Sequence, residues 1–150
     1  VGRVNLLSKL EVPRIFRGGV SLDDRGYVKF NNDFDFNGIK RFYMVENHNE
    51  GFIRAWHGHI KESKYVCVIS GAALIGAVSL SEKSSKPHKF TLDSSSLDIL
   101  YIPKGYANGF MNLKNNTKII FFSDSTIEET VDDDIRFDYD KWNIWSKNYR

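Results

Sequence analysis

The sequence predicts an all-β fold, an antiparallel β-barrel with little helix, that spans residues 1–150 as a single domain. Short runs of strand-forming residues recur between turn signals along most of the chain, a spacing typical of sandwiches and barrels. Aromatic residues make up 14% of the chain, and their flat rings pack well on pleated sheets. No segment sustains the apolar period that an amphipathic helix requires. A chain of 150 residues is long enough to bury one hydrophobic core.

Polar segments rich in Gly, Asn, Ser and Pro separate the predicted strands. These turn and loop segments cover residues 48–51, 81–87, 93–96 and 115–116. The strands between them are predicted at Ile39–Glu46, Phe52–His59, Lys64–Ser70, Ala72–Leu80, His88–Leu92, Leu97–Ile102, Tyr106–Leu113 and Thr117–Asp124. The acidic stretch Glu128–Asp134 lacks apolar content and predicts a solvated turn. Trp142 and Trp145 stand in a polar context, so at least one ring is expected to dock on the barrel or on a second subunit.

Charge and composition exclude several kinds of partner. The net charge is +2 with acids and bases interspersed, which gives no electrostatic footprint for nucleic acid or a membrane surface. No apolar run approaches transmembrane length and the start lacks a signal-peptide pattern, so the cytoplasm is the expected compartment. Cys67 is the only cysteine, which excludes an intrachain disulfide and predicts a buried small hydrophobe.

Two spaced motifs are similar to those of the cupin superfamily, whose fold is a jelly-roll barrel. Gly51, His57, His59, Lys64 and Gly71 have the spacing of the first cupin motif, in which a Glu stands at the position of Lys64. The run Pro103-Lys-Gly-Tyr-Ala-Asn108, followed by Asn112, resembles the second motif with Asn108 in place of a third His. Metal cupins use three His and one Glu, and a lysine repels a cation. No metal and no other cofactor is therefore expected.

The two histidines of the first motif are predicted to share one face of a strand. His57 and His59 are two residues apart, so their side chains point to the same side of a regular strand. If that side faces the interior of the barrel, both imidazoles are bases near neutral pH in a partly dry site. Arg54 is three residues from His57 and falls on the opposite face unless the strand bulges.

From about Asp24 to Trp145 the sequence resembles the dTDP-4-dehydrorhamnose 3,5-epimerase family of nucleotide-sugar epimerases. The matching elements are Asp24-Arg25-Gly26-Tyr27, Asn47, Arg54–His57, Lys64, Ile102–Phe110 and the closing Ile135–Trp145. The resemblance implies an epimerase acting on a nucleoside-diphosphate 4-keto-6-deoxy sugar in deoxysugar or O-antigen biosynthesis. It also implies a homodimer with N-terminal strands exchanged or added across the interface.

The resemblance assigns roles to individual residues. It implies that His57 is the catalytic base and that Lys64 stabilises the enolate, with His59 nearby as a second polar group or shuttle. Substrate-binding roles fall on Arg25, Tyr27, Asn47, Arg54 and Asn108, with the two arginines at the diphosphate and nucleotide. These residue types suit the chemistry, because proton removal beside a ketone needs a base and a cation near the oxyanion.

The sequence departs from the family where the family holds its proton donor. The general-acid Tyr of the family falls near Thr126 or Ile127, and the Asp that orients the base falls beyond Trp145. The proton is then expected from Tyr106, Tyr101 or water, and we hypothesise a reaction confined to C3.

Two other functions stay open. The run Arg54–Lys61, with Ile39-Lys40-Arg41 and Ile135-Arg136, is also similar to the sugar 3,4-ketoisomerases. The loss of the acid, of a cavity His and of the orienting Asp also fits a catalytically inactive cupin that binds sugar nucleotides.

Overall fold

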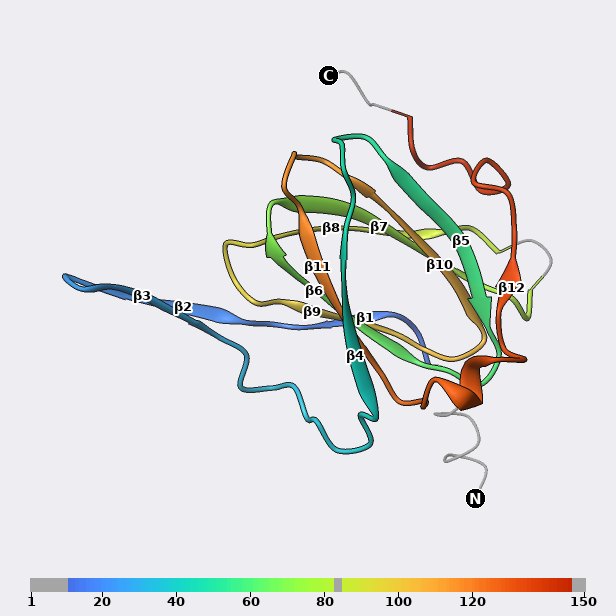
Figure 1. Cartoon of the computed structure of the whole chain (residues 1–150), viewed down its shortest axis with the longest axis horizontal. Helices are drawn as coiled ribbons and strands as arrows, with labels where there is room; N and C mark the ends of the chain where they lie inside the picture. Colours follow the sequence, from blue (N-terminus) through green and yellow to red (C-terminus); the bar gives the residue numbers. More distant parts are fainter. Residues whose placement is uncertain (1–10, 83–84, 147–150) are drawn as a thin grey trace.

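The computed structural model describes residues 11–82 and 85–146, which form two five-stranded antiparallel sheets and a two-stranded hairpin (Figure 1). One sheet has the strand order β1 (Arg14–Phe16), β9 (Ile99–Ile102), β6 (Lys64–Ser70), β11 (Lys118–Ser123) and β4 (Arg41–Glu46). The other has β12 (Ile135–Arg136), β5 (Ile53–His59), β10 (Tyr106–Asn112), β7 (Ala72–Ser79) and β8 (His88–Asp93). The hairpin is β2 (Gly19–Asp23) and β3 (Gly26–Phe30), and a 3-10 turn, η1, covers Glu128–Thr130. No helix in these two ranges has the length and hydrophobicity needed to cross a membrane.

This architecture confirms the predicted all-β jelly-roll barrel. Each predicted strand overlaps an observed one, because alternating apolar residues mark strands with one buried face. In β11, for example, Ile119 and Phe121 are buried while Ile120 and Phe122 are only partly so. The sequence did not predict β1, the β2–β3 hairpin or β12, which are short, edge or largely exposed strands with a weak apolar pattern.

The main core lies between the two sheets. Val66, Ile75, Leu100 and Ile119 have 0–2% of their surface exposed and pack in one cluster with Phe110 and other inward-facing residues. Cys67 is also buried, and burial raises the pKa of its thiol to about 11, as expected for an inert side chain.

A second cluster attaches the C-terminal segment to the outer surface of β5. The Trp56 ring is fully buried, with the Trp142 and Trp145 ring centroids 5.4 and 5.2 Å away. Trp56 and Phe137 also exchange two backbone hydrogen bonds of 3.1 Å each. Both tryptophans of the tail therefore dock on the barrel. The close fit requires glycine at position 76, where a Cβ would lie 2.5 Å from the Trp56 ring.

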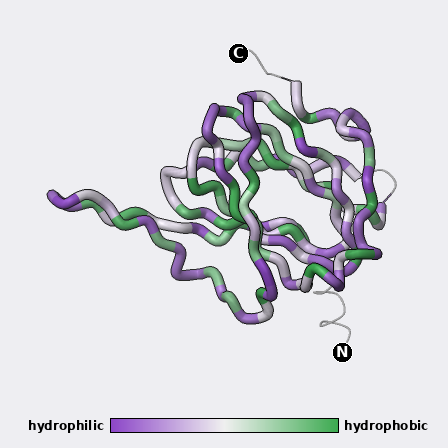
Figure 2. Tube along the Cα trace, viewed as in Figure 1, coloured by the Kyte–Doolittle hydropathy of each residue, from purple (hydrophilic) through white to green (hydrophobic). Residues whose placement is uncertain are grey.

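The β2–β3 hairpin projects from the barrel (Figure 1). Its base is tied down by Asn31, whose side-chain amide donates to the carbonyls of Leu97 at 2.7 Å and Phe16 at 3.0 Å. Apolar residues continue along the projecting part (Figure 2), where Leu22 is 77% and Val28 is 64% exposed. The hairpin thus carries an apolar surface that the rest of residues 11–82 and 85–146 leaves uncovered.

Replacing Trp56 with Ala is expected to lower the free energy of unfolding by about 3–5 kcal/mol, because the cavity left behind cannot collapse between two packed tryptophans. Urea unfolding followed by far-ultraviolet circular dichroism measures this loss. Tyr139→Ala is the matched control, since its side chain is 56% exposed and only its backbone carbonyl bonds to Trp56. Equal losses in both variants would contradict the assignment of Trp56 as the anchor of the C-terminal segment.

Candidate active site

A polar cavity of about 270 Å³ lies between the two sheets. It is lined by Arg41, Tyr43, Val45, Arg54, His57, His59, Glu62, Lys64, Asn108, Phe110, Phe121, Thr130, Asp134 and Arg136. The histidines come from β5, whereas Tyr43 and Lys64 come from β4 and β6 of the opposite sheet. Side chains that are far apart in the sequence thus face one another across the cavity.

A β-bulge places Arg54 on the same face as His57. In the pairing of β5 with β10, Asn108 is opposite His57 but Gly109 is opposite Ala55, so Trp56 is an extra residue. An extra residue reverses the alternation of side chains beyond it. Arg54 and His57 therefore both line the cavity, while the Trp56 ring points to the outer cluster. The sequence predicted that Arg54 would share a face with His57 only if the strand bulged, and β5 does bulge between them.

His57 faces a carboxylate from the acidic turn. Its Nδ1 lies 3.8 Å from Asp134 Oδ1, which leaves Nε2 as the nitrogen available to a substrate. Burial lowers the pKa of His57 below its ordinary 6.5, and the charges of Arg136 and Lys64 lower it further against the opposing effect of Asp134. At neutral pH the imidazole is therefore uncharged, the form in which it can accept a proton.

Asp134 stays ionised beside this imidazole. Arg136 donates from Nε and Nη2 to Asp134 Oδ2, both at 3.1 Å. Burial opposes ionisation of Asp134, but the hydrogen bonds and charge of Arg136 hold its pKa below the ordinary value. A carboxylate next to a base stabilises the imidazolium that forms when the base takes a proton. Asp134 thus lies where it can stabilise a protonated His57.

His59 is more deeply buried and has one unpaired nitrogen. Its Nδ1 donates to the Asp133 carbonyl at 2.5 Å, so in the neutral ring Nε2 carries the lone pair. Nε2 is buried without a hydrogen-bond partner among the described residues. Burial, followed by the charge of Lys64, lowers the pKa of His59 despite the nearby carboxylate of Glu62. A buried acceptor without a partner is suited to a ligand hydroxyl or to proton transfer.

Most of the acidic turn is exposed, as predicted for Glu128–Asp134, but the prediction was wrong at Asp133. Asp133 is 5% exposed, and its carboxylate accepts from the backbone N–H groups of Ile60, Lys61 and Glu62 at 2.7, 3.0 and 3.0 Å. These bonds fix the turn that joins β5 to β6. Low apolar content misled the prediction, because buried carboxylates can be satisfied by backbone donors.

Lys64 is a buried cation on the wall opposite the histidines. It is 8% exposed and makes no salt bridge with the described residues. Its Nζ lies 5.7 Å from the Tyr43 ring centroid and 5.8 Å from that of Phe121, within the range of cation–π attraction. An ammonium group without an anionic partner is available to an anionic oxygen of a ligand.

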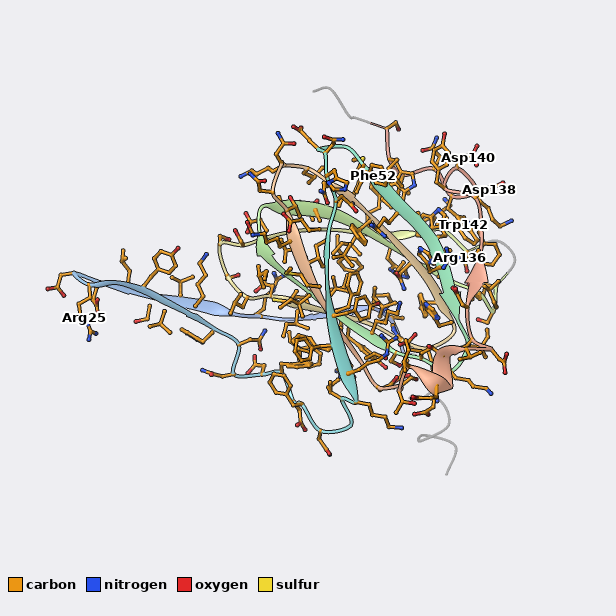
Figure 3. All side chains as sticks on the ribbon, viewed as in Figure 1. Arg25, Phe52, Arg136, Asp138, Asp140 and Trp142 are labelled. Carbon is orange, nitrogen blue, oxygen red and sulfur yellow. The ribbon has the colours of Figure 1, made fainter. Side chains whose placement is uncertain are left out.

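Four residues predicted to bind substrate lie at different distances from the cavity. Asn108 lines it, and Asn47 lies buried behind it, where it accepts a 2.6 Å hydrogen bond from Arg54 Nε. Arg25 and Tyr27 do not reach the cavity of their own chain. They belong to the projecting hairpin, and Figure 3 shows Arg25 near its tip, far from Arg136.

Neither tyrosine proposed as a proton donor lines this cavity. Tyr106 lines a separate cavity with Glu11 and His88, and its hydroxyl points to the Glu11 carbonyl at 3.5 Å. Tyr101 donates to the Glu11 carboxylate at 3.2 Å, and burial raises its pKa to about 12. Although Tyr106 is opposite His59 in the β10–β5 pairing, its ring closes the neighbouring cavity instead.

The sequence did not identify several side chains of the cavity: Arg41, Tyr43, Glu62, Asp134 and Arg136. Arg41 and Glu62 form a 2.8 Å salt bridge in the wall, with Glu62 only 2% exposed. The alternation of Tyr43 and Val45 with the exposed Phe42 and Met44 was a usable signal for the inward face of β4. Within residues 11–82 and 85–146, no three His, Cys, Asp or Glu side chains are grouped as metal ligands.

The family model described as dTDP-4-dehydrorhamnose 3,5-epimerase matches residues 10–148 of the chain. The chain belongs to this family. Its members are carbohydrate epimerases of the isomerase class. No curated protein sequence matches the chain at a significant level.

Three solved structures share the fold of this epimerase-family chain. A dTDP-4-dehydrorhamnose 3,5-epimerase from Elizabethkingia anophelis has a TM-score of 0.71 at 19% identity, over 88% of this chain and 81% of that one. A 3,4-ketoisomerase from Helicobacter canadensis has a TM-score of 0.66 at 20% identity, over 87% and 93%. ChmJ, a 3'-monoepimerase from Streptomyces bikiniensis, has a TM-score of 0.66 at 15% identity, over 76% and 64%.

Replacing Lys64 with Met is expected to raise the pKa of both His57 and His59, because the ammonium charge lowers each of them. The imidazolium forms will then persist to higher pH than in the unmodified protein. NMR titration of the imidazole Cε1 protons measures this without a substrate, and the chain has only 4 histidines to assign.

Lys61→Met is the matched control, because Lys61 is exposed in the turn before Lys64. Its substitution should leave both titrations unchanged. Identical titration curves for Lys64→Met and the unmodified protein would show that the ammonium does not act on the imidazoles.

Proposed function

We propose that the protein is an isomerase of a nucleoside-diphosphate 4-keto-6-deoxy sugar. The observation that carries this proposal is the placement of His57 and Lys64 on opposite walls of one cavity. A proton beside a ketone is removed only if the electrons that it leaves behind are stabilised as an enolate. His57 supplies a neutral base with an adjacent carboxylate, and Lys64 supplies a buried positive charge.

In this mechanism, His57 Nε2 takes the proton from the carbon beside the ketone. The electron pair of the C–H bond moves into the new C=C bond, and negative charge develops on the ketone oxygen. Lys64 stabilises that oxygen, and Asp134 stabilises the imidazolium. Return of a proton to the opposite face of the carbon inverts its configuration. We propose C3 as the inverted carbon, within deoxysugar or O-antigen synthesis in the cytoplasm.

The charge of the cavity suits a diphosphate. Arg41, Arg54, Lys64 and Arg136 line it against only two carboxylates, Glu62 and Asp134. Guanidinium groups pair with phosphate oxygens through two parallel hydrogen bonds. Arg54 lines the same cavity as His57, and in this proposal it would bind a phosphate while His57 meets the sugar. Asn47, which accepts from Arg54, would orient this guanidinium.

We also propose that two copies of the chain associate. The outer face of β4 exposes Phe42 by 70% and Met44 by 53%, next to an aromatic group that includes Phe36. Contiguous apolar surface of this kind marks a protein interface. The projecting hairpin adds its own apolar residues to the uncovered surface. In a dimer, the hairpin would bring Arg25 and Tyr27 to the partner's cavity, which accounts for two predicted binding residues that this chain leaves outside.

One observation favours a second reaction, 3,4-keto isomerisation. His59 lines the same cavity as His57 and keeps Nε2 free. Moving a ketone from C4 to C3 requires proton transfer at both carbons and a group that carries the proton between the two oxygens. A second imidazole beside the first is suited to that transfer.

Replacing His57 with Asn is expected to lower kcat/KM by about 10³-fold, because general-base catalysis contributes 10²–10⁴. Binding of the nucleotide sugar should survive, since the arginines are unchanged. Proton NMR in heavy water, with a panel of nucleoside-diphosphate 4-keto-6-deoxy sugars, measures the reaction directly. Retention of normal turnover in His57→Asn would remove His57 from the mechanism.

The position of the deuterium distinguishes the candidate functions. Deuterium at C3 alone indicates a single-site epimerase, and deuterium at C3 and C5 indicates the double reaction. A 3-keto product indicates the ketoisomerase. Binding without any exchange indicates a cupin that only binds sugar nucleotides and would reject the proposed isomerase.

The double variant Phe42→Asp/Met44→Asp is expected to be monomeric, because two carboxylates would be buried without partners in the interface. Sedimentation velocity compares it with the unmodified protein, which should sediment as a dimer. Val131→Asp is the control, because Val131 is 75% exposed and belongs neither to β4 nor to the aromatic group beside it. A monomeric unmodified protein would refute the dimer.

A further inference from the structure

The proposed reaction needs a proton donor that has not yet been assigned. Inversion at a carbon requires a base on one face of the enolate and a proton donor on the other. His57 lies on β5, so the donor is needed on the wall formed by β4, β6 and β11. Thr126 and Ile127, where the family resemblance places its acidic tyrosine, do not line the cavity.

Two hydroxyl-bearing residues line the cavity in the part of the chain that the structure describes. The Thr130 hydroxyl already donates to the Ile127 carbonyl at 2.7 Å. Tyr43 lies on β4, opposite the histidines, and its hydroxyl makes no hydrogen bond to a described residue. The hydroxyls of Tyr101 and Tyr106, in contrast, point to Glu11 outside this cavity. Tyr43 is therefore the phenol that a ligand in the cavity would meet.

The surroundings of Tyr43 hold its ring in place beside two cationic side chains. The ring stacks on Phe121 with centroids 5.2 Å apart and an interplanar angle of 8°. The Arg41 guanidinium carbon lies 5.0 Å and Lys64 Nζ lies 5.7 Å from the ring centroid. These two cations would draw an enolate oxygen to this wall.

We propose that Tyr43 is the catalytic acid that protonates the enolate on the face opposite His57, an inference that rests on the proposed isomerase function. The Tyr43 O–H bond breaks, and the electron pair of the enolate C=C bond forms the new C–H bond while the ketone reforms. The electron pair of the O–H bond stays on the phenolate oxygen. The phenolate regains a proton from water, and the His57 imidazolium releases one to water, so protons balance over one turnover.

Tyr43→Phe tests this role, because it removes the hydroxyl and keeps the ring that stacks on Phe121. The reaction is followed by proton NMR in heavy water with dTDP-4-keto-6-deoxyglucose. In the variant, deuterium should still enter the carbon beside the ketone, since His57 is unchanged. The inverted product should form at least about 100-fold more slowly, within the 10²–10⁴ range of acid catalysis. Exchange without inversion is a result that a merely structural defect would not give.

Tyr139→Phe, which removes an exposed hydroxyl elsewhere, should match the unmodified protein in both measurements. Inversion at the normal rate in Tyr43→Phe overturns the proposal, as does an equal loss of exchange and inversion. Loss of inversion in Tyr106→Phe, with Tyr43→Phe unaffected, would transfer the role to Tyr106. If the unmodified protein exchanges no proton of any 4-keto sugar, the proposed function fails and this role fails with it.

Discussion

The site depends on one buried carboxylate, that of Asp133. Its oxygens accept from the backbone N–H groups of Ile60, Lys61 and Glu62, and its carbonyl accepts from His59. Without this carboxylate, the three backbone N–H groups of the turn would lack hydrogen-bond partners, and each unpaired donor would cost free energy. The carboxylate satisfies all three, and it thereby fixes the direction in which β6 leaves β5. His57 and His59 before the turn, and Lys64 after it, meet in one cavity for this reason.

Packing outside the barrel holds this carboxylate in place. The bulge in β5 turns the Trp56 ring outward, where Trp142 and Trp145 cover it. Those contacts attach the C-terminal segment to the sheet through the short strand β12, and β12 follows directly after Asp133 and Asp134. The same bulge turns Arg54 inward. A single extra residue thus aligns a hydrophobic anchor on one face with a polar site on the other.

The sequence predicted the parts of the site that depend on local spacing. The period of a β-strand placed His57 and His59 on one face, and the spacing of the first cupin motif added Lys64 to them. It did not predict Asp134 or Tyr43, because their places depend on pairings between distant strands. Charge alone made Asp133 look solvated, and only the backbone donors of a turn some 70 residues earlier explain its burial. Arg25 illustrates a different limit of the sequence. Its motif predicts a substrate-binding residue, but a motif does not show whether that residue reaches the cavity of the same chain.

In the proposed reaction, the buried charge of Lys64 acts both on the base and on the enolate. An ammonium group near two imidazoles lowers their affinity for protons, so both stay neutral at pH 7 and can act as bases. The same charge would weaken the base if nothing opposed it, because the imidazolium must form during the reaction. The negative charge of Asp134 opposes this effect at His57. Asp134 lies beside Nδ1 of the ring, so Nε2 stays available to a substrate. In the proposed reaction, the transfer of a proton from carbon to His57 would create positive charge beside Asp134 and negative charge beside Lys64. Each new charge therefore develops next to a fixed charge of the opposite sign, which is the arrangement that stabilises a transition state more than a ground state.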